Sequence, residues 1–136
     1  MTPVLVDSGF FVALFDPSDH LAAPAARYLR EHSHPLATVS ATLIEACFFL
    51  APDRKAELLT WVRRGAASVV EIPVQAYPQL ELTLRKYADR DIDIADAGLI
   101  WLANETGARR ILTVDRKDFE IYRLKGNRYF EVIDWF

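Results

Sequence analysis

Near its N-terminus the 136-residue chain runs Val4-Leu5-Val6-Asp7-Ser8-Gly9-Phe10-Phe11-Val12-Ala13-Leu14-Phe15-Asp16-Pro17. The apolar run 4–6, ended at once by Asp7, predicts a short buried strand. From Ser8 onward the residues predict a short helix that stops near Asp16-Pro17. The sequence therefore places one carboxylate, that of Asp7, at the carboxyl end of the first strand.

The same alternation of strand and helix continues along the chain. Further strands are predicted at 36–39, 68–72, 110–114 and 129–133, and further helices at 20–32, 40–50, 53–64, 75–87 and 94–105. Ser40 is expected to be the N-cap of the helix that it begins. Because each connection is long enough for a crossover, the pattern predicts an α/β sandwich on a mainly parallel sheet. The length predicts a single domain over residues 1–136.

The composition narrows the class of protein. Apolar residues make up 51% and charged residues 26% of the chain, as in soluble globular proteins. The single cysteine, Cys47, excludes an internal disulfide and favours a reducing, cytoplasmic setting. No apolar run approaches the ~20 residues of a membrane helix, and no basic stretch marks a signal peptide. The net charge of −3 argues against a protein that binds nucleic acid through its overall charge. Residues 109–128 are nevertheless basic, with seven Lys and Arg residues and three acids.

Four acidic residues occupy positions that are unusual for a carboxylate. Asp7 and Asp115 each follow a predicted strand, so both lie at the carboxyl ends, where sheets of this kind bind ligands. Glu45 lies in a predicted helix that is apolar nearly all round. Asp96 lies on the apolar, core-facing side of its own predicted helix. The fold therefore directs four carboxylates toward one region.

A divalent cation would resolve the cost of this arrangement. Buried carboxylates without partners are expensive and repel one another, and the sequence supplies no Arg or Lys at comparable positions. Oxygen ligands without Cys or His suit Mg²⁺ or Mn²⁺ better than Zn²⁺. Taken singly, Asp7 and Asp96 could cap helices and Asp115 could begin a turn. Glu45 could reach solvent at an edge, but the coincidence of all four favours a metal site.

Four segments carry a family resemblance: Val4-Leu5-Val6-Asp7-Ser8, Ile44-Glu45, Asp96-Ala97-Gly98-Leu99-Ile100 and Thr113-Val114-Asp115-Arg116-Lys117-Asp118-Phe119. In their order and spacing the chain resembles the PIN-domain family of nucleases, and in length and layout the VapC-type toxins of toxin–antitoxin pairs. The resemblance covers essentially the whole chain. It implies a three-layer α/β/α fold, an acidic pocket that binds Mg²⁺ or Mn²⁺, and endonucleolytic cleavage of RNA.

Carried over position by position, the resemblance implies catalytic roles for Asp7, Glu45, Asp96 and Asp115. Asp7, Asp96 and Asp115 would be metal ligands, around one ion or two, and Glu45 could be a ligand or orient the attacking water. Ser8, Thr113 and Asp118 would support the site, with Asp93 a weaker candidate than Asp118. Contacts to RNA phosphates are expected from the basic stretch, at Arg116, Lys117, Arg123, Lys125 and Arg128.

Other side chains suggest packing, surface or interface roles. The three histidines His20, His32 and His34 are expected on the surface, away from the acids. Packing in the core is expected for Phe48, Phe49, Trp61 and Trp101. The early apolar cluster predicts a homodimer or antitoxin interface and comprises Phe10, Phe11, Leu14, Phe15, Tyr28 and Leu29.

Two other functions share some of these features. A phosphoacceptor receiver domain also gathers Asp residues at strand ends around Mg²⁺, but Glu45 and Asp96 lie on predicted helices. A PIN-like fold could also bind RNA with weak catalysis or none. Aspartyl-phosphate labelling, and RNA binding compared with RNA cleavage, separate these functions from a nuclease.

Overall fold

The sheet has five strands in the order β3-β2-β1-β4-β7, and every neighbouring pair is parallel. The computed structural model describes residues 2–136. The strands are β1 (Val4–Val6), β2 (Leu36–Val39), β3 (Ser68–Val70), β4 (Arg110–Leu112) and β7 (Glu131–Val132). The predicted parallel sheet is therefore confirmed.

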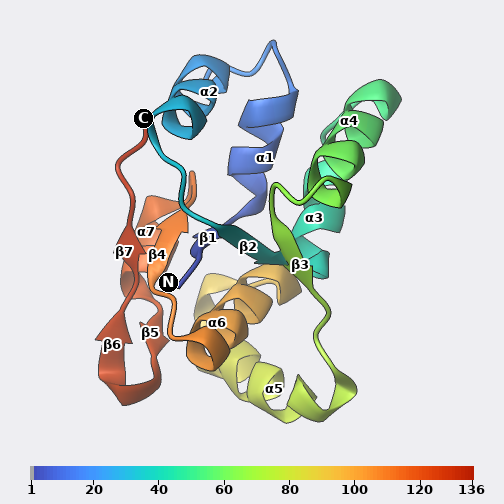
Figure 1. Ribbon diagram of the computed structural model, residues 1–136. Helices are drawn as coiled ribbons and strands as arrows, with labels where there is room; N and C mark the ends of the chain where they lie inside the picture. Colours follow the sequence, from blue (N-terminus) through green and yellow to red (C-terminus); the bar gives the residue numbers. More distant parts are fainter. Residues whose placement is uncertain (1) are drawn as a thin grey trace.

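Helices cover both faces of this sheet (Figure 1). One face carries α1 (Ser8–Phe15), α2 (Ala22–Glu31), α3 (Ser40–Cys47) and α4 (Pro52–Arg63). The other carries α5 (Tyr77–Lys86) and α6 (Ile94–Thr106), and α7 (Arg116–Ile121) follows β4. A small antiparallel pair, β5 (Arg123–Leu124) and β6 (Arg128–Tyr129), stands apart from the main sheet. No helix in the described part of the chain is long and apolar enough to pass through a bilayer.

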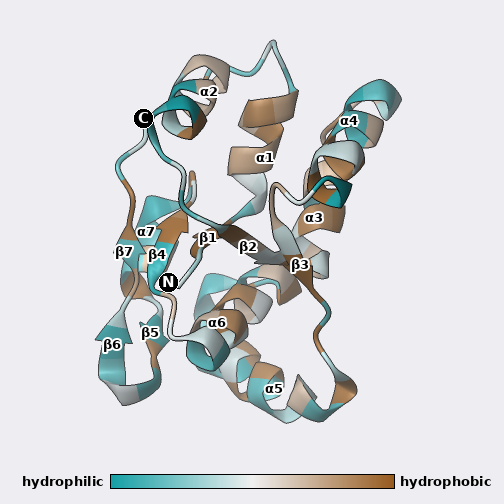
Figure 2. Cartoon of the chain, viewed as in Figure 1, coloured by the Kyte–Doolittle hydropathy of each residue, from teal (hydrophilic) through white to brown (hydrophobic). Residues whose placement is uncertain are grey.

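The strands are apolar because both faces of the sheet are buried. Side chains alternate along a strand, so Leu5 joins the apolar cluster under α6 while Val4 and Val6 join the cluster under α1. All three side chains are fully buried. Figure 2 shows the same division, with hydrophobic strands inside and hydrophilic residues at the outer helix faces and the β5–β6 turn.

The order of the strands places the site. From β1 the chain moves outward to β2 and β3, and later returns to the other side of β1 with β4 and β7. The topology therefore reverses between β1 and β4, and in open parallel sheets ligands bind at the carboxyl ends beside such a reversal. Asp7 follows β1 and Asp115 lies just beyond β4, so both flank this point.

Several local predictions differ from the structure. Ser40 is the first residue of α3 rather than its N-cap, because Val39 holds the cap position and the Ser40 hydroxyl donates to Glu71 instead. This helix ends at Cys47, short of the expected 50. The predicted strand 129–133 is broken at Phe130 into β6 and β7. Neither α7 nor β5 was expected.

The predicted interface on the first two helices is only partly covered by the chain itself. Phe10 and Phe11 are fully buried, and Tyr28 is 6% exposed, within the cluster that also contains Trp135. Edge-to-face contacts join Phe10 to both Tyr28 and Trp135. The other three predicted residues, Leu14, Phe15 and Leu29, are partly buried, so the interface stays a prediction.

A valine in place of Gly98 should destabilise the fold. A Cβ at this position would lie 2.8 Å from Ile72 Cδ1 and 3.0 Å from Val39 Cγ2, so α6 approaches the sheet too closely for a side chain. We expect Gly98→Val to lower the free energy of unfolding by about 1–3 kcal/mol, the usual cost of overpacking. Urea denaturation measures it, with Glu105→Val on the exposed side of α6 as control; equal stability of the two variants would contradict the packing argument.

Candidate active site

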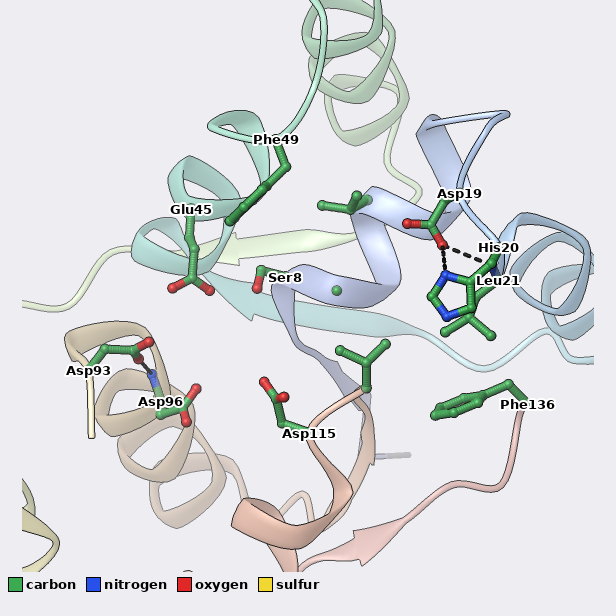
Figure 3. A pocket seen from close by; sticks show the side chains of 13 residues that line it. Ser8, Asp19, His20, Leu21, Glu45, Phe49, Asp93, Asp96, Asp115 and Phe136 are labelled. Carbon is green, nitrogen blue, oxygen red and sulfur yellow. Dashed lines mark hydrogen bonds and ion pairs between the residues drawn. The ribbon is translucent and has the colours of Figure 1, made fainter. Parts of the chain in front are cut away.

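A pocket of about 490 Å³ lies at the carboxyl end of the sheet. Its acidic side is lined by Glu45 from α3, Asp93 and Asp96 at the start of α6, and Asp115 after β4. Figure 3 shows these four carboxylates directed toward a common space, although they are widely separated along the chain. Ser8 also lines the pocket, and Asp7 lies directly before it, at the end of β1.

Asp7 is held rigidly at the junction of β1 and α1. Its backbone N–H donates to Leu112 O at 3.0 Å, which fixes the residue against β4. Its Oδ1 accepts from the backbone N–H of Ser8 at 2.8 Å, and its Oδ2 accepts from the Thr113 hydroxyl at 2.7 Å. The side chain is 1% exposed. Burial, with smaller contributions from Asp115 and Glu45, raises its pKa to about 7, although the two hydrogen bonds oppose the shift.

Asp96 is the second buried carboxylate, 8% exposed in the first turn of α6. Its backbone N–H donates to Asp93 Oδ1 at 2.8 Å, so Asp93, rather than Asp96, is the side chain that caps this helix. The Tyr122 hydroxyl donates to Asp96 Oδ2 at 2.8 Å. Burial first, and then the charges of Asp7 and Asp93, raise the pKa of Asp96 to about 8, while the hydrogen bond from Tyr122 opposes the shift.

The remaining two predicted acids are closer to solvent. Glu45 is half-buried in α3, and desolvation with the nearby charges of Asp93 and Asp115 raises its pKa. Asp115 is exposed at the start of α7, and desolvation together with Asp118 and Asp93 raises its pKa. The pKa of all four predicted carboxylates is therefore raised, first by desolvation and then by the charge of at least one neighbouring acid.

No cation within the chain offsets this penalty. None of the four acids takes part in an ion pair within residues 2–136, and neither Lys nor Arg lines the pocket. Over the same residues, no three acidic, His or Cys side chains are gathered closely enough to surround an ion, as expected for like charges that repel. The oxygen-only donor set and the raised pKa values of Asp7 and Asp96 fit a hard divalent cation such as Mg²⁺ or Mn²⁺.

Of the three residues predicted to support the acids, Ser8 and Thr113 lie at the site, whereas Asp118 lies beside it. Thr113 bonds Asp7 and also accepts from the backbone N–H of Asp115 at 3.0 Å, so one hydroxyl links two of the acids. Ser8 lines the pocket. Asp118 lies in a neighbouring pocket and is bound by Arg90 at 2.9 Å. Asp93 is thus nearer to the other acids than Asp118, the reverse of the order expected from the sequence.

The basic stretch does not form one surface beside the pocket. Arg116 and Lys117 line the neighbouring pocket of about 490 Å³, but Arg116 is already bound to Asp134 at 2.9 Å. Arg123, Lys125 and Arg128 lie on the β5–β6 hairpin or its turn. The backbone N–H of Lys125 donates to Asn104 near the end of α6, about 12 Å along the helix from Asp96. Of the five predicted RNA contacts, Arg116 and Lys117 are therefore nearest the acids.

Three side chains near the acids were not expected there. Tyr122 is buried against Asp96, and no motif in the sequence marks it. His20, which was expected on the surface away from the acids, is exposed but lines the same pocket. Phe49 was expected in the core, yet it is 69% exposed at the rim, and Phe48 beside it is 78% exposed. They became surface residues because α3 ends at Cys47, which the apolar periodicity did not reveal.

Removing only the hydroxyl of Tyr122 should impair the site without damaging the fold. The ring packs edge-to-face on Tyr87 and Phe119, and phenylalanine retains both contacts. We expect Tyr122→Phe to weaken the binding of Mn²⁺ to this pocket about tenfold, a typical loss when the group that orients a metal ligand is removed. The exposed Tyr129→Phe is the matched control. Equal Mn²⁺ affinities for both variants would show that the hydroxyl does not orient Asp96.

Comparisons with known proteins bear on the fold and the family of the chain. The family model described as PIN domain matches residues 4–125. Ribonuclease VapC26 from Mycobacterium tuberculosis (strain ATCC 25618 / H37Rv) is 26% identical over 134 residues, covering 96% of this chain and 99% of that protein. The crystal structure of Mycobacterium tuberculosis VapC20, titled a sarcin-ricin loop cleaving toxin, superposes with a TM-score of 0.70 at 19% identity, covering 79% of this chain and 86% of that one.

Proposed function

The chain belongs to the PIN-domain family, and we propose on that basis that it is a metal-dependent endoribonuclease acting as the toxin of a toxin–antitoxin pair. The ribonuclease and the toxin to which it is similar support this assignment. The observation that carries it is the pair of buried carboxylates, Asp7 and Asp96, whose pKa values are raised to about 7 and 8. Asp7 also caps α1, as its structural alternative predicted, but a cap does not require burial beside a second acid, and carboxylates whose pKa values are raised in this way are typical of functional sites.

Each acid has a defined part in the proposal. Asp7, Asp96 and Asp115 would hold Mg²⁺ or Mn²⁺, and Glu45 would either join them or orient the attacking water. The bound ion supplies an activated water and neutralises charge that develops on the phosphate. Thr113 and the backbone of Ser8 orient Asp7, and Tyr122 orients Asp96. Tyr122 remains a donor throughout, because burial and Asp96 raise the pKa of its hydroxyl far above neutrality.

A cleavage assay tests the proposed ribonuclease activity, and expression in cells tests the proposed role as a toxin. Purified protein should cleave single-stranded RNA with Mg²⁺ or Mn²⁺ and not with EDTA, and Asp7→Asn should not cleave it. Expression of the parent alone should arrest growth, whereas Asp7→Asn should not. If the parent cleaves RNA but does not arrest growth, the nuclease activity stands and the toxin role is wrong. If the parent binds RNA but does not cleave it, the chain is an RNA-binding module instead.

The receiver-domain alternative is not supported. Receiver-like sheets have the strand order 2-1-3-4-5, whereas the five strands here, counted along the chain, lie in the order 3-2-1-4-5. Glu45 and Asp96 also lie on helices, as the sequence predicted, rather than at strand ends.

A second copy of the chain and an antitoxin protein belong to the same proposal, as does a cytoplasmic location. A further candidate for the homodimer contact, beside the first two helices, is a groove of about 390 Å³ between α3, α5 and α6. Ile44, Tyr77 and Ile94 line it and are each about half exposed. Sedimentation velocity of the parent and of Ile44→Glu tests this contact, since a dimer held by this groove should dissociate in the variant.

A further inference from the structure

Only part of the catalytic pocket is acidic. The rest of its wall is formed by Val12, Leu21, Phe49, Val114 and Phe136, which we call the apolar half. Figure 3 shows Phe49 above Glu45 at one rim, and Phe136 on the far side of Asp115. At about 490 Å³ the pocket is much larger than a phosphate and its metal ions need. The apolar half therefore has space for another part of the substrate.

The floor of the apolar half is tightly closed. A Cβ at Gly9 would lie 2.5–3.3 Å from three side-chain atoms of Val114, so the first turn of α1 rests directly on that valine. The contact brings Val114 and Val12 together as one apolar floor. A flat, uncharged group could lie on this floor, whereas a phosphate there would lose its hydration without gaining a cation.

Aromatic rings bound the same region. Phe49 is 69% exposed and offers a free ring face. Phe136 is 43% exposed, and its ring already carries the Arg116 guanidinium at 4.3 Å and the ring of Trp135 edge-to-face, so it closes the far side of the region. Exposed aromatic rings beside a nucleic-acid site offer stacking faces, and stacking on such a ring contributes about 1–3 kcal/mol per base. Resting on the proposed function, we propose that the apolar half binds one nucleobase of the RNA strand beside the phosphate that is cleaved.

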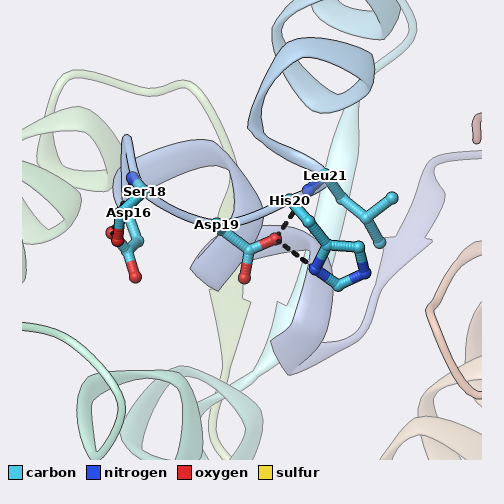
Figure 4. A network of polar contacts seen from close by, with 5 residues as sticks. All are labelled: Asp16, Ser18, Asp19, His20 and Leu21. Carbon is cyan, nitrogen blue, oxygen red and sulfur yellow. Dashed lines mark hydrogen bonds and ion pairs between the residues drawn. The ribbon is translucent and has the colours of Figure 1, made fainter.

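Asp19 supplies the polar edge of this base site. It lines the pocket, and its Oδ1 accepts from the backbone N–H of Leu21 at 2.9 Å and lies 3.7 Å from His20 Nδ1 (Figure 4). An ionised carboxylate can only accept hydrogen bonds. Guanine presents two adjacent N–H donors on its pairing edge, whereas uracil presents one N–H donor between two carbonyl oxygens that the carboxylate would repel. The base site therefore selects guanine over uracil.

The chain offers a matched control for each contact. Phe48 is the exposed neighbour of Phe49 but does not line the pocket. Asp16 forms the same kind of turn as Asp19, accepting from the backbone N–H of Ser18 at 3.0 Å, but lies outside the pocket (Figure 4). Asn at either position keeps an oxygen for the turn, and both substitutions remove one negative charge, but only Asp19→Asn changes a side chain that lines the pocket.

The test measures RNA binding separately from cleavage. The probes are fluorescein-labelled octauridylate and eight versions that each carry one guanosine, bound in an Asp96→Asn background and read by fluorescence anisotropy. We expect one guanosine position to bind about tenfold more tightly than octauridylate. Phe49→Ala should weaken binding of all probes about tenfold, and Asp19→Asn should abolish the guanosine preference. Phe48→Ala and Asp16→Asn should change neither property.

The outcomes separate the base site from the nuclease. If the parent cleaves RNA but Phe49→Ala and Asp19→Asn behave like their controls, the base site is wrong and the nuclease stands. If no preparation cleaves RNA but the guanosine preference is present and is lost in Asp19→Asn, the base site stands and the nuclease is wrong. Absence of binding to any probe would overturn the base site, and the cleavage assay on the parent would decide the nuclease separately.

Discussion

Replacing Asp96 by Asn is expected to lower the rate of RNA cleavage by about three orders of magnitude. The substitution keeps the size of the side chain and an oxygen that can accept from Tyr122, so the fold and the hydrogen bond at Oδ2 are retained. It removes one negative charge from a group of acids that no Lys or Arg side chain within residues 2–136 neutralises. If the carboxylate holds a metal ion that takes part in the reaction, its loss removes several kcal/mol of transition-state stabilisation. Each 1.4 kcal/mol of that stabilisation corresponds to a tenfold change in rate.

The same variant should be more stable than the parent when divalent cations are absent. The pKa of Asp96 is about 8 in the folded protein and 3.8 ordinarily, so the folded state binds a proton more tightly than the unfolded state. The contribution of this group to stability is therefore fully present below about pH 4 and is lost as the pH rises toward 8. Asn carries no charge and avoids this loss.

Urea denaturation in EDTA at pH 5 and pH 8, together with initial cleavage rates in Mn²⁺, checks both expectations. The control is Asp89→Asn in an exposed turn, which should change neither the rate nor the stability. Loss of activity accompanied by loss of stability at pH 8 would mean that Asp96 supports the fold rather than the reaction.

The sequence was most informative where the position of a side chain in its own strand or helix decides where that side chain lies. Asp7 directly follows an apolar strand and Asp96 lies on the apolar side of a helix, and these two relations placed both residues in the structure as expected. Glu45 and Asp115 also line the predicted region. Which of these side chains bind a metal stays a prediction, because the geometry describes the carboxylates and not an ion.

The sequence was least informative where long-range packing decides. Tyr122 meets Asp96 across 26 positions, and Trp135 covers Phe10 across 125, so neither contact leaves a local pattern. Phe48 and Phe49 continue the apolar periodicity of α3 but lie beyond its end, where hydrophobicity alone cannot show that a residue is exposed. The proposed base site therefore rests partly on Phe49, which sequence reasoning assigned to the core.

The second large effect concerns divalent cations themselves. At pH 8, Mn²⁺ at about one hundred times its dissociation constant should stabilise the fold by about 2.7 kcal/mol and raise the melting temperature by about 10 °C. At pH 5.5 the shift should shrink to about 1–2 °C, because Asp7 and Asp96, with pKa values of about 7 and 8, are protonated and protons compete with the ion. Differential scanning calorimetry measures the shift, with KCl at equal ionic strength as the control for screening. The double variant Asp7→Asn/Asp96→Asn should show no specific shift at either pH. A shift that is independent of pH, or that persists in the double variant, would place the cation elsewhere on the molecule and remove the electrostatic basis for the catalytic site.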